Sequence, residues 1–135
     1  MVKIQATYQG QKQCLALHEE SGSTLLTDAP KDNQGLGEKF SPTDLVATAM
    51  GTCILTTIAI VAERDQINVT GAKIFVEKIM NDKPRKIASL KTEIHLPKSI
   101  PEDYRKKMEH SANACPVKKS LAADIAVPIE IKYIL

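Results

Sequence analysis

The chain has 135 residues, and its 18 Lys and Arg residues nearly balance its 16 Asp and Glu residues, giving a formal net charge of +2 at pH 7. Charged residues make up 25% and apolar residues 43% of the sequence, which excludes a disordered or fibrous chain. The small net charge and the scattered lysines argue against nucleic-acid binding. We therefore expect one globular domain over residues 1–135, with no nucleic-acid partner.

The amino terminus and the cysteines predict the cellular compartment. Residues 1–10 (MVKIQATYQG) contain neither an apolar stretch nor a small-residue cleavage site, so we expect a cytoplasmic protein rather than a secreted one. In a reducing compartment, three cysteines far apart in sequence are not expected to form structural disulfides, and their spacing is not that of a zinc site. Any role of Cys14, Cys53 and Cys115 would depend on their thiols.

The first 27 residues predict three short strands separated by turns. Apolar and polar residues alternate at the start of the chain, as in a strand with one buried face. The expected extended segments are residues 2–7, 14–18 and 23–27, and Gly10 and Gly22 mark the turns between them.

A long apolar helix is predicted after a loop at residues 28–39, which contains two glycines, a proline and many polar residues. Ser41 can cap the helix, Pro42 suits its first position, and Asp44 completes a capping-box pattern. The segment Leu45–Ala62 then runs for 18 residues without a charge.

The apolar faces of this helix must be buried against other protein surface. About 22 helical residues span roughly 33 Å, and apolar residues occupy every face. A monomer of 135 residues can hardly wrap so long a helix, which predicts a partner chain. The uncharged run reaches the lower limit for a membrane span. Four threonines dilute its hydrophobicity, however, and no second span accompanies it, so we expect a core helix and no membrane partner.

The next segment predicts a long β-hairpin. Strands are expected at about residues 68–81 and 86–96, joined by a turn at residues 82–84 that contains Pro84. The imperfect alternation predicts a bulge. The residues expected to face the core are Ile74, Val76, Ile79, Ile87, Leu90, Ile94 and Leu96.

Two helices and a strand complete the chain. Ser99 is expected to cap a highly charged helix at residues 101–110, a shorter helix runs from Pro116 to about residue 123, and a strand covers residues 127–134. Because strands and helices are grouped rather than alternating, the predicted class is α+β.

The thiols differ in their expected chemistry. Free cysteine is among the most buried residue types, so Cys53, within an apolar helix, is on physical grounds a packing residue with a raised pKa. Cys115 precedes Pro116 and falls at a helix N-cap near two lysines, which predicts the lower pKa of the two thiols. Cys14 lies in a strand pattern on the same face as Ala16 and His18, and we expect packing or edge exposure. The isolated histidines, His18, His95 and His110, are expected at the surface.

Asp44 could orient a reacting group, but its place on the helix argues otherwise. Nine residues separate it from Cys53, which puts the two side chains roughly 180° apart around the helix and about 13 Å apart along it. Capping and the helix dipole explain Asp44 without catalysis.

Taken together, the stretch FSPTDLVATAMGTC and the stretch ACPVKKSL, whose cysteine lies 62 positions after Cys53, resemble the OsmC/Ohr family of osmotically inducible protein C and organic hydroperoxide resistance proteins. The resemblance covers nearly the whole chain. It implies one OsmC-like domain in which antiparallel sheets pack around a long central helix. It also implies an intertwined homodimer with active sites at the subunit interface.

The resemblance further implies a thiol-dependent peroxidase. Cys53 would attack an organic hydroperoxide and become a sulfenic acid, and Cys115 would condense with it into a disulfide. A dithiol reductant, lipoyl or thioredoxin-like, would reopen that disulfide, and no cofactor or metal is required. The family therefore assigns the attack to Cys53, whereas the physical argument favours Cys115.

Two positions depart from the peroxidase pattern. The early segment TYQGQKQ has no arginine, and Lys12 is its nearest cation. The acid after the helix-starting proline stands at Asp44 rather than at Thr43, which is typical of the divergent OsmC-like branch. Lys12 and Asp44 are the candidate helpers of Cys53. The alternatives are a small-molecule-binding protein on the same scaffold, and a structural dimer with two buried cysteines.

Overall fold

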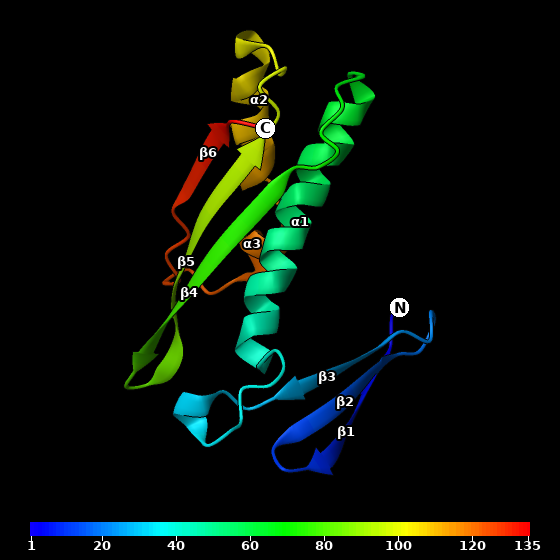
Figure 1. Cartoon of the computed structure of the whole chain (residues 1–135), viewed down its shortest axis with the longest axis vertical. Coiled ribbons are helices and arrows are strands. Elements are labelled where there is room, and N and C mark those ends of the chain that lie inside the picture. The colour runs from blue at the N-terminus through cyan, green and yellow to red at the C-terminus, as the bar shows by residue number, and fades with distance from the viewer. The chain divides into compact units, whose positions relative to one another are not determined.

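The computed structural model describes all 135 residues and confirms an α+β fold (Figure 1). Its elements are β1 (Ile4–Gly10), β2 (Gln13–His18), β3 (Thr24–Asp28), a 3-10 turn (Lys31–Asn33), α1 (Pro42–Arg64), β4 (Lys73–Asp82), β5 (Arg85–Leu96), α2 (Glu102–Asn113), α3 (Pro116–Ser120) and β6 (Ile129–Tyr133). Contacts divide the chain into two compact units, Met1–Val46 and Ala47–Leu135, and each is described by itself.

The first unit is a three-stranded antiparallel sheet in the order β1-β2-β3, which confirms the three predicted strands. The loop after β3 is tied back to the strand: the Asp28 amide donates to the Phe40 carbonyl at 3.0 Å, and the Glu38 amide donates to Asp28 Oδ2 at 3.0 Å. The large apolar side chains on β1 and β3 remain exposed; these are Ile4, Tyr8, Leu25 and Leu26. A sheet this small cannot bury a core of its own.

The start of α1 has the predicted capping box. The Asp44 amide donates to Ser41 Oγ at 3.1 Å, and the Ser41 amide donates to Asp44 Oδ2 at 2.9 Å. Two amides that the helix itself leaves unpaired are therefore satisfied, and Pro42 occupies the first helical position without needing a donor.

We expect Ser41→Ala to lower the free energy of unfolding by about 1 kcal/mol, because it removes the buried acceptor of this box. Urea unfolding followed by circular dichroism measures the change. Ser99→Ala is the matched control, because the predicted cap at Ser99 is wrong: α2 begins after Pro101 with no side-chain capping bond. A loss of stability at Ser99 equal to that at Ser41 would contradict the assignment.

The second unit contains a mixed sheet in the order β4-β5-β6. The β4 and β5 strands form the predicted antiparallel hairpin, and its register shifts between Ile79 and Met80, which confirms the expected bulge. The β6 strand pairs parallel to β5, from Thr92↔Ile129 to Leu96↔Tyr133. The expectation of purely antiparallel sheets is therefore wrong for this pair, because the connection through α2 and α3 returns the chain in the same direction.

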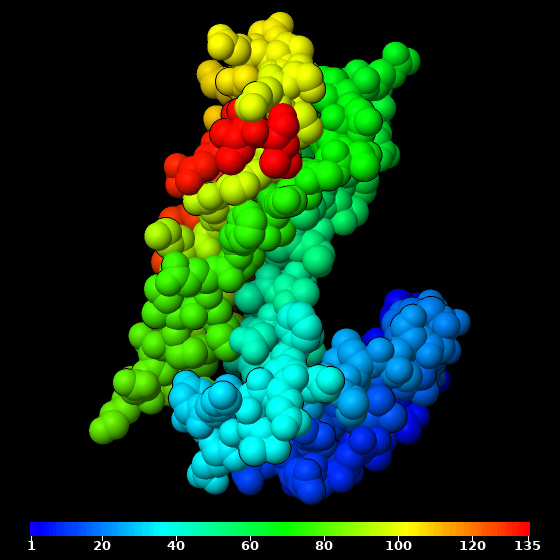
Figure 2. Space-filling model, in the orientation of Figure 1, coloured from blue at the N-terminus to red at the C-terminus, as the bar shows by residue number.

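The hydrophobic core of this unit lies between α1 and the sheet. Met50, Ile54 and Ile58 of α1 are fully buried, as are Leu90 and Ile94 of β5. In the space-filling view the atoms of the unit, coloured from cyan-green to red, form a continuous surface on the face shown (Figure 2). Because these residues are buried, one face of the middle of α1 is held against the sheet.

Gly51 allows α1 to approach the sheet closely. A Cβ atom built there would lie 3.2 Å from Val76 Cγ2 and 3.5 Å from Ile74 Cγ2, so a larger side chain would push the helix away. Ile74 and Val76 thus face the helix as predicted. Ile79 does not: it is 47% exposed, because the regular alternation of β4 places it on the same face as Phe75, opposite Ile74 and Val76.

Several element boundaries also differ from the sequence prediction. The first hairpin strand begins at Lys73 rather than near residue 68, and α3 ends at Ser120 rather than near residue 123. The last strand is shorter than expected, running from Ile129 to Tyr133. These differences lie at element ends, where local sequence signals are weakest.

The face of α1 opposite the sheet is open in this chain. Its exposed residues recur at helical spacing and are Thr48, Ala49, Thr52, Thr56 and Ile60. By length and composition α1 could also cross a membrane, but a single helix of this kind is weak support, because core helices share these properties.

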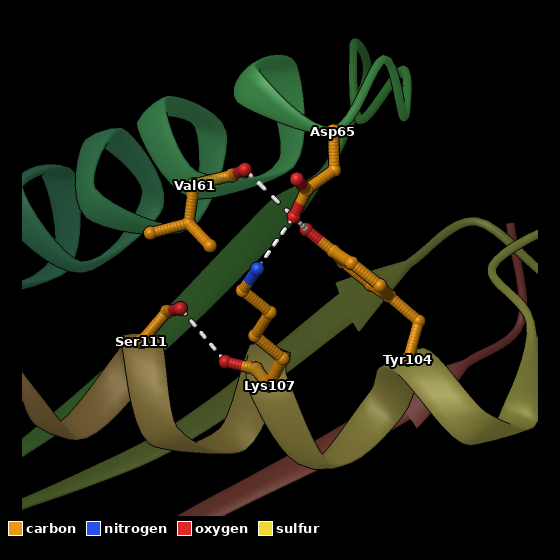
Figure 3. A network of polar contacts seen from close by, with 5 residues as sticks. All are labelled: Val61, Asp65, Tyr104, Lys107 and Ser111. Atoms are coloured by element: carbon orange, nitrogen blue, oxygen red, sulfur yellow. Dashed lines mark hydrogen bonds and ion pairs between the residues drawn. The ribbon is translucent and has the colours of Figure 1, made fainter.

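A polar cluster joins the end of α1 to α2 (Figure 3). Asp65 Oδ2 accepts from Tyr104 Oη and from Lys107 Nζ, both at 2.6 Å, and Tyr104 Oη also lies 3.3 Å from the Val61 carbonyl oxygen. The hydrogen bonds from Lys107 and Tyr104 lower the pKa of Asp65. Burial and the bond to Asp65 raise the pKa of Tyr104 to about 12.

The cluster predicts a loss of stability at alkaline pH. A tyrosine ordinarily titrates near pH 10. Because the folded pKa of Tyr104 is higher, its stabilising contribution is present below about pH 10 and is lost as the pH rises toward 12. Absorbance at 295 nm should show a late-titrating tyrosine that Tyr104→Phe removes. Ionisation of Tyr104 with a midpoint near pH 10 would contradict the assignment.

Candidate functional site

The fold brings two of the predicted site residues into contact. Cys53 lies in the middle of α1, and Cys115 is the N-cap of α3, directly after α2. The side chains of Cys53 and Cys115 lie close enough for each to shift the pKa of the other, and both cysteines are free. Both belong to the unit Ala47–Leu135, so the contact is formed within one chain.

Cys115 is held in place by the local geometry of α3. Pro116 fixes the first helical position, and the Cys115 Sγ accepts from the Lys118 amide at 3.4 Å. The same sulfur lies 3.9 Å from the carbonyl oxygen of Met50, one turn before Cys53. The Cys115 side chain is fully buried, so its position depends on the packing of α3 against α1.

Cys53 is half-buried and is surrounded by hydrogen-bond donors. Besides the Cys115 thiol, these are the backbone N–H of Val117 and the hydroxyl of Thr57. The Thr57 Oγ1 also donates to the Cys53 carbonyl oxygen at 2.9 Å. Together these groups favour the thiolate form of Cys53.

These contacts set the order of the two thiol pKa values. Burial raises the pKa of Cys53, but the hydrogen bonds from Cys115, Val117 and Thr57 outweigh it and hold this pKa below its ordinary value. Burial, and then the hydrogen bond to Cys53, raise the pKa of Cys115, and the Lys118 amide offsets them only in part. The expectation that Cys115 has the lower pKa is therefore wrong. The local sequence showed that Cys115 is a helix N-cap with two lysines nearby. It showed neither the burial of Cys115 nor the proximity of Cys53.

The arrangement supports redox chemistry between two sulfur atoms. A thiol in contact with a neighbour of lowered pKa can form a disulfide once that neighbour is oxidised. Cys14 lies in the other unit, on β2 opposite Tyr8 and Thr27, and is half-buried there. No group of three His, Cys, Asp or Glu side chains in the chain could hold a metal ion.

The two candidate helpers belong to the first unit. Lys12 occupies the turn between β1 and β2 with a positive φ of 61°, and its amide donates to Tyr8 Oη at 3.2 Å. Asp44 forms the capping box with Ser41. The action of either residue on the thiols stays a prediction.

Sequence reasoning missed two contributors to the site. The Val117 amide reaches Cys53 only through the packing of α3 against α1, and no local signal reveals it. Thr57 stands one helical turn after Cys53, and this spacing could have identified it. Of the histidines, His95 is not isolated: its Nε2 pairs with Glu93, and its ring lies 5.0 Å from that of Phe75.

Comparisons with known proteins agree with this architecture. The family model described as OsmC-like protein matches residues 35–131. A solved structure from Psychrobacter arcticus 273-4, whose proposed role is that of an osmotic stress induced and detoxification response protein, is 38% identical, with a TM-score of 0.93. The match covers 98% of this chain and 96% of that one. The comparison with curated proteins gave no match.

More distant structures share the fold. The organic hydroperoxide resistance protein OsmC of Legionella pneumophila is 16% identical with a TM-score of 0.78, over 98% of this chain and 96% of that one. OhrB of Bacillus subtilis, also an organic hydroperoxide resistance protein, is 17% identical with a TM-score of 0.68, over 98% of both chains. The match to residues 35–131 and the 38% identity confirm the resemblance inferred from the two cysteine-containing stretches. The chain belongs to the OsmC-like protein family.

Proposed function

We propose that this protein is a cytoplasmic thiol-dependent peroxidase that reduces organic hydroperoxides. The observation that carries the proposal is the contact between Cys53, whose pKa is lowered, and Cys115, whose pKa is raised. This pairing places a nucleophile beside a thiol that can resolve its oxidised form. The family relationship and the named hydroperoxide resistance proteins of the same fold support the substrate class.

In the first step the Cys53 thiolate attacks the outer oxygen of a hydroperoxide. The O–O bond breaks, the sulfur becomes a sulfenic acid, and the organic fragment leaves as an alcohol after taking up a proton. The donors from Cys115, Val117 and Thr57 stabilise the thiolate before attack. Sulfur loses the two electrons that reduce the peroxide, so no metal or organic cofactor is required.

In the second step Cys115 attacks the sulfur of the Cys53 sulfenic acid. A disulfide forms within the subunit, and the hydroxyl leaves as water with the thiol proton of Cys115. A dithiol reductant, lipoyl or thioredoxin-like, then reopens the disulfide by exchange. The burial of Cys115 keeps its thiol protonated until the sulfenic acid appears.

The proposed active form is a homodimer with its sites at the subunit interface. The open face of α1, defined by Thr48, Ala49, Thr52, Thr56 and Ile60, presents small side chains and one exposed isoleucine to a second copy. The uncovered apolar residues of the first unit also require a partner surface. Within this dimer Lys12 and Asp44 are the proposed helpers of Cys53.

The decisive activity assay follows consumption of cumene hydroperoxide in the presence of dihydrolipoamide. The proposal expects turnover well above that of an equal concentration of free cysteine. The rival is a small-molecule-binding protein, favoured by the absence of an arginine from the β1–β2 turn, where Lys12 stands. Turnover no faster than free thiol, together with a ligand retained in native mass spectrometry, would select this rival.

A further inference from the structure

Three threonines on α1 make the same backbone contact. Thr52, Thr56 and Thr57 each donate their hydroxyl to the carbonyl oxygen four residues earlier, at distances of 2.8, 2.9 and 2.9 Å. Such a bond is common for threonine within a helix and by itself has no chemical role. Because all three make the same backbone hydrogen bond, any further contact that one of them makes can be judged against the other two.

Thr57 differs from the other two in its neighbours. The carbonyl it contacts belongs to Cys53, one helical turn earlier, and the same hydroxyl lowers the pKa of the Cys53 thiol. Thr57 is half-buried, whereas Thr52 and Thr56 are exposed on the open face of the helix. Its hydroxyl proton can thus turn from a carbonyl acceptor to the sulfur atom without a change in the side-chain rotamer.

We propose that Thr57 is a positioning residue that stabilises the thiolate of Cys53, an inference that rests on the proposed function. While Cys53 is a neutral thiol, the hydroxyl remains on the Cys53 carbonyl. When Cys53 loses its proton, the sulfur becomes the stronger acceptor, and a hydrogen bond to a charged atom exceeds one to a carbonyl. Thr57 therefore favours the reactive form of Cys53.

The surroundings of Cys53 make this contribution important. Cys115 is the titratable group in direct contact with it, and no charged side chain shifts its pKa. On α3, the Lys118 ammonium donates to Asn113 Oδ1 at 2.9 Å, and its backbone amide donates to Cys115. Within this chain, neutral donors rather than a cation stabilise the Cys53 thiolate.

The test measures thiol reactivity without any peroxide. Alkylation of Cys53 by iodoacetamide is followed by peptide mass spectrometry between pH 5 and 10 in the wild type, Thr57→Val, Thr57→Ser and Thr56→Val. Thr57→Val keeps the shape of the side chain but removes the donor, so we expect alkylation about threefold to tenfold slower on the acidic side of the profile. The plateau at high pH should not change.

The other two variants separate chemistry from structure. Thr57→Ser restores the hydroxyl and is expected to restore the wild-type profile, and Thr56→Val removes an equivalent backbone bond and is expected to leave it unchanged. A Thr57→Val profile that matches the wild type, a failure of Thr57→Ser to restore it, or an equal shift in Thr56→Val would each overturn the inference. The alkylation test uses no peroxide. A wild type without peroxidase activity would therefore refute the proposed function, but it would not change the outcome of the alkylation test.

Discussion

Replacing Cys53 with Ser is expected to lower dithiol-dependent consumption of cumene hydroperoxide by roughly 100-fold or more, because it removes the half-buried thiol of lowered pKa that is the proposed nucleophile. Cys115→Ser should behave differently. The first oxidation remains possible, so one equivalent of peroxide is consumed, and dimedone traps a sulfenic acid on Cys53. Stopped-flow consumption followed by mass spectrometry measures both results.

Cys14→Ser is the matched control for these two variants. Cys14 lies on β2 in the first unit, whereas Cys53 and Cys115 both belong to the second, and its substitution is expected to leave peroxide consumption unchanged. Full activity in Cys53→Ser would refute the assignment of the nucleophile. Trapping of the sulfenic acid on Cys115 instead would reverse the two roles.

Replacing Ile60 with Arg is expected to convert the proposed dimer to a monomer. Ile60 is 48% exposed on the open face of α1, where a second copy of the helix would bury it. A cation buried there without a partner costs several kcal/mol, which is enough to dissociate a moderately stable dimer. Light scattering after size exclusion should give twice the 14.8 kDa chain mass for the wild type and one chain mass for the variant.

Phe75→Arg is the control for the substitution of Ile60. Phe75 is similarly exposed, at 54%, but it lies on β4 between two residues that face α1, so it points away from the helix. This variant is expected to stay dimeric. A wild type that elutes as a monomer at micromolar concentration, or an Ile60→Arg protein that remains a dimer, would contradict the proposed interface.

The sequence predicted those parts of the fold that local chemistry determines. The capping box at Ser41 needs residues only three positions apart, and the structure contains both of its hydrogen bonds. The bulge at Ile79 followed from imperfect alternation. The pairing of β6 with β5 could not be inferred in the same way, because its direction depends on how α2 and α3 cross the sheet rather than on residues within β6.

The candidate site also combines a feature that the sequence predicted with one that it could not predict. The family resemblance identified Cys53 and Cys115 as a pair, and the fold places them in contact. Their order of acidity could not be read from local sequence, because it depends on the complete burial of Cys115 and on the amide of Val117, which belongs to another helix. Physical reasoning confined to neighbours in sequence therefore predicted the wrong order of the two pKa values.

The central claim is that Cys53 and Cys115 form a redox pair, and residue-level mapping of thiol oxidation tests it most directly. The reduced protein is treated with substoichiometric cumene hydroperoxide, quenched with acid, alkylated and digested, and each cysteine is quantified by mass spectrometry. We expect a disulfide between Cys53 and Cys115 that accounts for the peroxide consumed, while Cys14 remains reduced. Unchanged thiols at Cys53 and Cys115 after the peroxide has been consumed, or oxidation confined to Cys14, would contradict the account.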